Sequence, residues 1–314
     1  MTVCSDQEIA RLIERLDSLI DGERAAMALV ACGQPAVQAL QRFLLDGRPR
    51  ALYQPRRWAV RALSALSAKT VLMEYLRSPA WIVDPVVQFA EDEVRGEAAR
   101  ELAGWASEDV FRLLREIAET AMLAGVIEAL SRFRRVDAVP YLVRALEDDF
   151  CREAAEQGLR ALGAAARPAL LVAAATPLPA RGEERPSSLR RRRSAVTLLS
   201  EIGITSGDWT TLEPLLGEND LEIQVETCRL ALAVGVSFDV TRTRDALIVA
   251  LPGAPWFLAD RIEECLAAMF AEDRGALERQ IRATFARERE AGDRDPLLQA
   301  LRRVKRRLDT VRTA

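Results

Sequence analysis

The stretch from Val136 to Gly163, VDAVPYLVRALEDDFCREAAEQGLRALG, constrains the fold more than any other part of the chain. Apolar residues at helical spacing mark two short segments, and Glu147, Asp148 and Asp149 fill the turn between them. Gly163 is a stop signal for the second helix. A helix pair of this size cannot bury its apolar face alone, so it requires a similar pair on each side.

Similar pairs recur along the whole sequence, and their second helices end at comparable signals. These are Gly33, Ser67, Gly163, Gly203 and Gly235, while Trp105 falls one residue earlier than the equivalent position. The stops recur about every 29 to 40 residues, with two repeats between Trp105 and Gly163, and this is the period of helical-hairpin arrays. The pattern predicts an all-α protein, with residues 1–314 forming a single array of about eight hairpins.

Two segments depart from this pattern. Residues 177–188 are rich in Pro, Gly, Ser and charge, and we expect them to form an exposed loop inserted between the two helices of one repeat. The last helix is predicted at 295–311, with Asp293 or Asp295 as its cap. Its basic outer face (Arg302, Arg303, Lys305, Arg306, Arg307) is what the terminal cap of a solenoid requires.

Composition limits the classes of partner. The 44 basic and 47 acidic residues give a formal net charge of −3, which disfavours a general attraction to nucleic acid or to anionic membranes. The N-terminus lacks a basic start followed by an apolar run, so we predict no signal peptide. The apolar run from Pro168 to Ala175 is too short to span a bilayer. We therefore expect a cytoplasmic monomer with no membrane association.

The residues that support most catalytic and metal sites are missing or badly placed. The chain has no histidine, which excludes Ser-His-Asp sites and His-bound metals. Glu263 and Glu264 are adjacent, so on a helix they point apart and form a poor acid–base couple. The five cysteines are widely separated and contain no CxxC pair, which predicts free thiols in a reducing compartment. We expect no enzyme activity, no cofactor and no metal.

Two segments carry a family resemblance. In PVVQFAEDEVRGEAARELAGW and VPYLVRALEDDFCREAAEQGLRALG, an acidic turn precedes an Arg-x-x-Ala-type second helix. In this the chain resembles HEAT repeats, particularly the short bacterial kind also found in phycobilisome lyase-like proteins. The resemblance implies a right-handed α-solenoid whose second helices line the concave side. It is nearly silent on function, since one fold serves many activities.

The repeat also places an arginine early in several second helices: Arg56, Arg95, Arg152 and Arg192, with Gln224 at the corresponding place in a later repeat. One interpretation is a binding stripe. The alternative is structural, with each arginine pairing with exposed carbonyls and carboxylates of its own or a neighbouring repeat. Single tryptophans (Trp58, Trp81, Trp105, Trp209, Trp256) are expected to pack in the core or between repeats, with Trp81 the most exposed.

The densest charge cluster is the run Arg190–Arg193 beside the inserted loop. Four positive charges near a helix N-terminus oppose the helix dipole, so they require Glu183 and Glu184 or an outside anion. Changing all four to Glu is expected to weaken partner binding and to leave the fold intact. The candidate partner-binding residues, all on second helices, are Arg57, Arg61, Arg100, Glu156, Arg160, Arg190, Arg191, Arg192, Arg193, Glu226 and Arg229.

Three hypotheses for function follow. The first is a non-catalytic scaffold that binds another protein on the concave face, since a surface of mixed sign suits a protein partner better than a phosphate backbone. The second is a nucleic-acid-binding protein related to the HEAT-like DNA glycosylases that act on alkylated bases. The third is a lyase-like chaperone that loads a chromophore or a subunit, which would require a deep apolar pocket.

Overall fold

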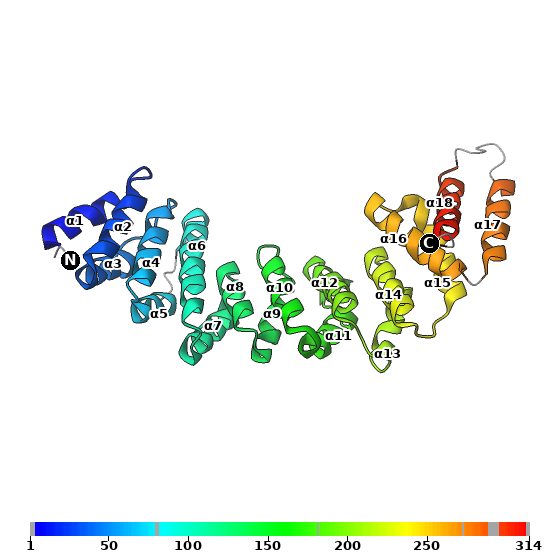
Figure 1. Cartoon of the computed structure of the whole chain (residues 1–314), viewed down its shortest axis with the longest axis horizontal. Coiled ribbons are helices and arrows are strands. Elements are labelled where there is room, and N and C mark those ends of the chain that lie inside the picture. Colours follow the sequence, from blue (N-terminus) through cyan, green and yellow to red (C-terminus); the bar gives the residue numbers. More distant parts are fainter. Residues whose placement is uncertain (1–3, 79–81, 181, 272, 288–294, 312–314) are drawn as a thin grey trace. The chain divides into compact units, whose positions relative to one another are not determined.

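A computed structural model describes residues 4–78, 82–180, 182–271, 273–287 and 295–311. The chain divides into two compact units, residues 1–162 and residues 163–314. Both are built from helices joined by short turns (Figure 1). The prediction of one continuous array over residues 1–314 stays a prediction.

The first unit consists of five helix pairs within the described residues. Their bounds are α1 Asp6–Arg15, α2 Gly22–Cys32, α3 Gln34–Leu45, α4 Gln54–Ala65, α5 Lys69–Arg77, α6 Pro85–Leu102, α7 Glu108–Thr120, α8 Ala124–Phe133, α9 Val139–Ala145 and α10 Arg152–Leu162. Two 3-10 turns, η1 Ala103–Trp105 and η2 Val136–Ala138, lie at helix ends.

The second unit adds four pairs, so the described residues contain nine pairs, against about eight expected. Their bounds are η3 Gly163–Ala166, α11 Arg167–Ala175, β1 Pro179–Ala180, β2 Glu183–Glu184, α12 Pro186–Ile202, α13 Trp209–Leu212, η4 Glu213–Gly217, α14 Leu221–Val234, α15 Val240–Ala250, η5 Leu251–Gly253, α16 Trp256–Phe270, α17 Arg274–Arg287 and α18 Pro296–Val311.

The helices of each unit form two layers. In the first unit, α2, α4, α6, α8 and α10 pack side by side in chain order, as do α1, α3, α5, α7 and α9 (Figure 1). In the second unit, α12, α14, α16 and α18 form the corresponding row. Buried Leu, Ala and Val fill the space between the layers. This is the arrangement of an α-solenoid, in which each hairpin shields the apolar face of the next from water.

Residues with positive φ mark the ends of second helices, as the repeat alignment predicts. Gly33, Ser67, Gly163, Gly203 and Gly235 all have φ between +56° and +85°, so the predicted stops are confirmed. Two further stops carry side chains, Ala106 at φ +48° and Arg134 at φ +50°. Both lie at the ends of second helices, where no glycine marks the stop.

The insertion expected at 177–188 lies between α11 and α12, its described residues are mostly exposed, and it contains a short antiparallel ladder. Pro179 pairs with Glu184 and Ala180 with Glu183 in a two-residue antiparallel ladder. Helix α12 begins at Pro186, inside the range expected for the loop, and the buried Ser188 hydroxyl donates to Glu184 Oε1 at 2.6 Å. Short-range hydrogen bonds therefore hold this insertion against the start of the helix that follows.

The C-terminal helix begins as expected, since Asp295 Oδ1 accepts from the N–H of Leu298 at 2.6 Å; Asp293 lies outside the described residues. Its basic residues are only partly a solvated face. Arg303 donates to Glu263 at 2.6 Å, Arg307 pairs with Asp260 and Glu263, and Lys305 reaches Glu278 at 3.2 Å. Much of the charge of α18 therefore fastens it to α16 and α17.

The cysteine prediction is wrong at the N-terminus. Cys4 and Cys32 form a disulfide that ties the start of α1 to the end of α2, while Cys151, Cys228 and Cys265 are free and buried. The separation of 28 residues in sequence hid this pair, because the hairpin folds back on itself. Disulfides persist in oxidising surroundings, so the cysteines no longer argue for a reducing compartment.

Two further expectations can be compared with the structure. Trp58 and Trp209 are buried as predicted, but Trp256 is 85% exposed at the start of α16, and Trp81 lies outside the described residues. The segment Arg152–Ala175, with a mean hydropathy of 1.2, meets the length and composition of a membrane span. Core helices of soluble proteins meet the same criterion, and Ala155, Leu159 and Leu170 of this segment are buried.

Candidate interaction surface

The early arginine of the second helix is structural. Arg56 Nε and Nη2 each donate to a carboxylate oxygen of Glu91 at 3.0 Å. Its Nη1 and Nη2 atoms also donate to the carbonyls of Phe43, Leu44 and Gly47 at the end of α3. These carbonyls have no partner within their helix, so the guanidinium caps the first helix of its own repeat and joins it to the next one through Glu91.

The early position of the second helix makes similar structural contacts in other repeats. Arg56, Arg95, Arg152, Arg192 and Gln224 each precede the positive-φ stop of their helix by eleven residues. Arg95 donates to the Leu76 carbonyl at 3.3 Å, Arg192 to the Ala174 carbonyl at 2.9 Å, and Gln224 to the Leu216 carbonyl at 2.8 Å. Arg152 pairs with Asp149 of the preceding turn at 2.5 Å. The structural alternative to a binding stripe is therefore correct.

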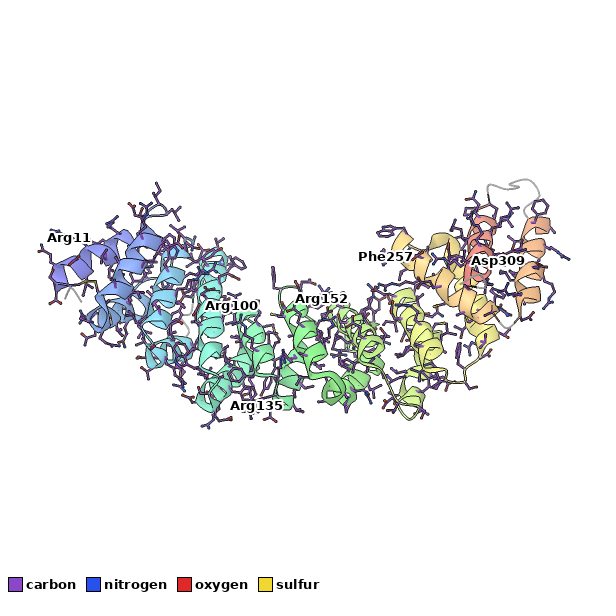
Figure 2. The ribbon with its side chains drawn as sticks, viewed as in Figure 1. Arg11, Arg100, Arg135, Arg152, Phe257 and Asp309 are labelled. Carbon is purple, nitrogen blue, oxygen red and sulfur yellow. A yellow bond between two sulfur atoms is a disulfide. The ribbon has the colours of Figure 1, made fainter. Side chains whose placement is uncertain are left out.

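A groove of about 540 Å³ crosses the second-helix layer of the first unit. We call it the arginine groove; its sides are formed by Arg57 and Arg61 of α4, Glu93, Arg100 and Glu101 of α6, and Arg132 of α8. Arg100 points from α6 toward α8, where it pairs with Glu128 at 2.6 Å (Figure 2). Three of the predicted partner-binding residues, Arg57, Arg61 and Arg100, thus lie together.

The buried carboxylate of Glu97 contacts three arginines of the groove. Its carboxylate accepts from Arg61 Nε at 2.5 Å, Arg57 Nη2 at 3.0 Å and Arg100 Nη1 at 3.2 Å. The Glu97 side chain is 6% exposed, whereas that of Arg61 is 49% exposed. Glu97 is not among the predicted partner-binding residues, and it lies buried beneath three arginines that come from two helices.

Electrostatics keep this cluster charged. Burial by itself raises the pKa of Glu97, but the hydrogen bond from Arg61 and the charges of Arg57 and Arg61 outweigh burial, so the pKa is lowered overall. Burial likewise lowers the pKa of Arg100, yet the hydrogen bond and charge of Glu128 raise it above its ordinary value. The groove therefore holds ionised arginines over an ionised carboxylate at neutral pH.

The second unit contains a similar cluster, in which a buried glutamate pairs with arginines of two helices. Glu226, predicted as a contact residue, is 1% exposed, so it cannot meet a partner directly. It pairs with Arg229 of its own helix at 2.9 Å and with Arg261 of α16. Glu97 with Arg100, and Glu226 with Arg229, share the pattern Glu-x-x-Arg at the same distance from the helix stop, a signal that the sequence contained.

The run Arg190–Arg193 also differs from its prediction. Arg192 is 2% exposed and pairs with Glu184 at 2.6 Å and with Glu218. Arg191 is buried and donates to the Thr176 carbonyl at 2.5 Å, while Arg193 pairs with Asp220 at 2.5 Å. Glu184 and the next repeat thus supply the negative charge that the helix start requires. Because these contacts are structural, changing the run to Glu would damage the fold.

The remaining candidates lie outside the groove. Glu156 is half-buried and Arg160 exposed on α10, and Arg190 is half-buried on α12. Across the described residues, no three His, Cys, Asp or Glu side chains come together as metal ligands. The chemistry that the surface offers is ionic and hydrogen-bonding recognition.

The fold and this polar surface define an α-solenoid protein. Residues 83–160, which include α6, α8 and α10, match the family model of HEAT repeats. This part of the chain therefore contains HEAT repeats, and the family resemblance seen in the sequence is confirmed there.

Comparisons with individual proteins add little. No curated protein sequence matches the chain. Among solved structures it is similar to human deoxyhypusine hydroxylase in complex with glycerol, with 17% identity over 84% of this chain and 96% of that chain. The TM-score is 0.31.

Proposed function

We propose that this protein is a non-catalytic scaffold that binds a protein partner at the arginine groove of its first unit. The observation that carries this proposal is the clamp at Glu97, where one buried carboxylate holds three guanidinium groups in fixed positions. Groups that are ordered before binding lose less entropy when a partner arrives.

The charge pattern favours a protein over nucleic acid. Arg57, Arg61, Arg100 and Arg132 are interleaved with Glu93 and Glu101 in the groove. A phosphate backbone needs a run of cations, and each neutralised phosphate contributes to affinity through counterion release. A protein surface can present both signs and satisfy both kinds of group.

The test uses the full chain to capture binding proteins from its source organism, followed by titration of each purified candidate by calorimetry. A Gly104→Trp variant fills the groove, and a Cβ at Gly104 has no atom within 4 Å, so the fold should tolerate it. Arg112→Glu, on the exposed part of α7, is the matched control. A partner whose affinity falls at least tenfold with Gly104→Trp and is unchanged with Arg112→Glu supports the proposal. Equal binding to all three proteins overturns it.

A further inference from the structure

We propose that the arginine groove recognises a short acidic segment of its protein partner, one that carries at least two Asp or Glu side chains within a few residues. This inference rests on the proposed function and adds the chemistry of the partner. Three observations carry it. Some arginine N–H groups in the groove have no acceptor among the described residues, the carboxylates of the groove are less exposed than Arg61 and Arg132, and there is open space beside Gly104.

Two arginines keep donors for a ligand. Within the described residues, Arg61 contacts Glu97 through Nε and so leaves both of its Nη atoms for other acceptors. Arg132 donates through Nη1 to the Arg100 carbonyl at 3.2 Å and retains its other N–H groups. Both side chains are exposed. Guanidinium groups with free parallel N–H bonds bind carboxylates in a bidentate manner.

The exposed charges of the groove are the arginines Arg61 and Arg132, whereas Arg57 and Arg100 are half-buried. Glu97 is buried under its three arginines, and Glu93 and Glu101 are half-buried. Glu101 also accepts from the Ser64 hydroxyl at 2.5 Å. An approaching anion therefore meets guanidinium groups first, whereas the Glu97 charge is already compensated by three short contacts.

The position of the two arginines requires more than one anionic group. Arg61 lies on α4 and Arg132 on α8, and these helices pack on opposite sides of α6. A ligand that engages both must cross α6. Gly104 lines the groove in η1, just after α6, and it is exposed with open space around it, so the backbone of an extended segment can approach there. A chain with acidic side chains a few residues apart meets these conditions.

The remaining carboxylates select for peptide over phosphate. Glu93 and Glu101 line the same groove and can only accept hydrogen bonds when ionised. A peptide supplies carboxylates to the arginines and backbone N–H groups to Glu93 and Glu101. A nucleic acid backbone presents negative acceptors to all of them, so the two glutamates would repel it.

Fluorescence anisotropy with defined probes tests the inference on the full chain. The probes are a ten-residue peptide with four Asp or Glu in a Gly-Ser background, the same peptide with Asn and Gln in their place, and a ten-nucleotide single-stranded DNA. We expect binding of the acidic peptide, at least tenfold weaker binding of the amide peptide and of the DNA, and weakening of the acidic complex by salt.

Variants assign the binding to the groove. Arg61→Glu with Arg132→Glu, and separately Arg61→Gln with Arg132→Gln, should weaken the acidic peptide at least tenfold, Gly104→Trp should abolish binding, and Arg112→Glu should have no effect. Arg61 and Arg132 are both exposed, and unchanged helicity verifies that the variants fold. Equal binding of the amide peptide, tighter binding of DNA, or binding that survives in both double variants overturns the inference. If Gly104→Trp loses a purified partner but no acidic peptide binds, this inference fails and the scaffold proposal stands.

Discussion

Arg56 shows how one side chain can close a helix pair and attach it to the next. It is buried, it caps the three carbonyls at the end of α3, and it holds Glu91, which also accepts from the Tyr75 hydroxyl at 2.5 Å. Burial, followed by the charge of Glu91, raises the pKa of Tyr75, so the tyrosine stays a neutral donor to that carboxylate. Loss of Arg56 would leave a buried carboxylate without its counter-ion.

We therefore predict that Arg56→Ala lowers the free energy of unfolding by about 3–5 kcal/mol, the typical cost of breaking a buried ion pair from one side. Urea denaturation followed by circular dichroism measures it. Arg112→Ala, an exposed arginine on α7, is the control and should change stability by less than about 0.5 kcal/mol. A loss below about 1 kcal/mol for Arg56→Ala would show that the cap is dispensable.

The lowered pKa of Glu97 predicts how the free energy of unfolding depends on pH. Its pKa is lower in the folded protein than in the unfolded chain, so its contribution to stability is present at neutral pH and is lost as pH falls through the folded pKa. We predict that wild type loses more stability than Glu97→Gln between pH 7 and pH 3, measured by urea denaturation at each pH. Parallel pH profiles for the two proteins would contradict this account.

The residues that sequence reasoning misplaced share one cause. Glu97, Arg192 and Glu226 are charged, and charge in a helical pattern predicts a solvated side chain. Burial depends on which charged residue of the neighbouring repeat lies opposite, and that pairing is set by the stacking of helices. The capping contact of the early arginine was predictable, because the carbonyls that it meets belong to the first helix of its own repeat, whereas its carboxylate partners Glu91 and Glu218 belong to the next one.

At the scale of elements, glycine sets how closely second helices approach. A Cβ added to Gly125 on α8 would lie 2.2 Å from the carbonyl oxygen of Gly96 on α6, so the two backbones are nearly in contact. Side chains cannot intervene at this crossing. The approach also brings Arg100 of α6 within reach of Glu128 of α8.

Gly125→Ala should therefore separate α6 from α8 and cost about 1–3 kcal/mol, as overpacking does. Thermal unfolding measures the loss. Gly104→Ala is the matched control, because a Cβ there meets nothing within 4 Å, and it should leave stability within about 0.5 kcal/mol of wild type. Should the two variants unfold at the same temperature, the close crossing would have no energetic role.

The disulfide is a second feature that stabilises a pair of helices. By joining Cys4 to Cys32 it restricts the unfolded first hairpin, and such bridges typically add about 2–4 kcal/mol. We predict that dithiothreitol lowers the melting temperature of wild type and has no effect on Cys4→Ser. Thiol titration in denaturant should find the three free cysteines before reduction and all five after it. Five thiols without reductant would mean that the bridge does not form.

Helix ends were predictable where the residue at the stop itself favours positive φ. They were not predictable where contacts with other parts of the fold impose that conformation. Glycine at positive φ identified most of the stops, since only glycine adopts that conformation without strain. Ala106 and Arg134 adopt it as well, and nothing in their side chains announces it. The short ladder at Pro179 and Glu184 was likewise hidden, because Pro and Glu are poor strand formers.

At the scale of the whole molecule, periodicity predicted the helix pairs and their order, but it carried no information on where the array divides. The border between the units follows Leu162, at a Gly stop like the others. Repeat arrays gain stability from intrinsic terms and from contacts between neighbours, and a residue pattern that continues past Leu162 reports neither, so the division was not predictable from it.

The division predicts that residues 1–162 and residues 163–314, produced separately, each fold. Each part contains its own row of second helices and its own buried apolar residues, so both should show helical circular dichroism and cooperative unfolding. A cut between Thr120 and Ala121 is the control, because it removes contacts inside the first unit, including that between Phe111 and Phe133, whose ring centroids are 5.2 Å apart. Residues 1–120 and 121–162 should then unfold without cooperativity. Were either half to gain structure only when mixed with the other, folding would depend on the whole chain and the units would not be independent.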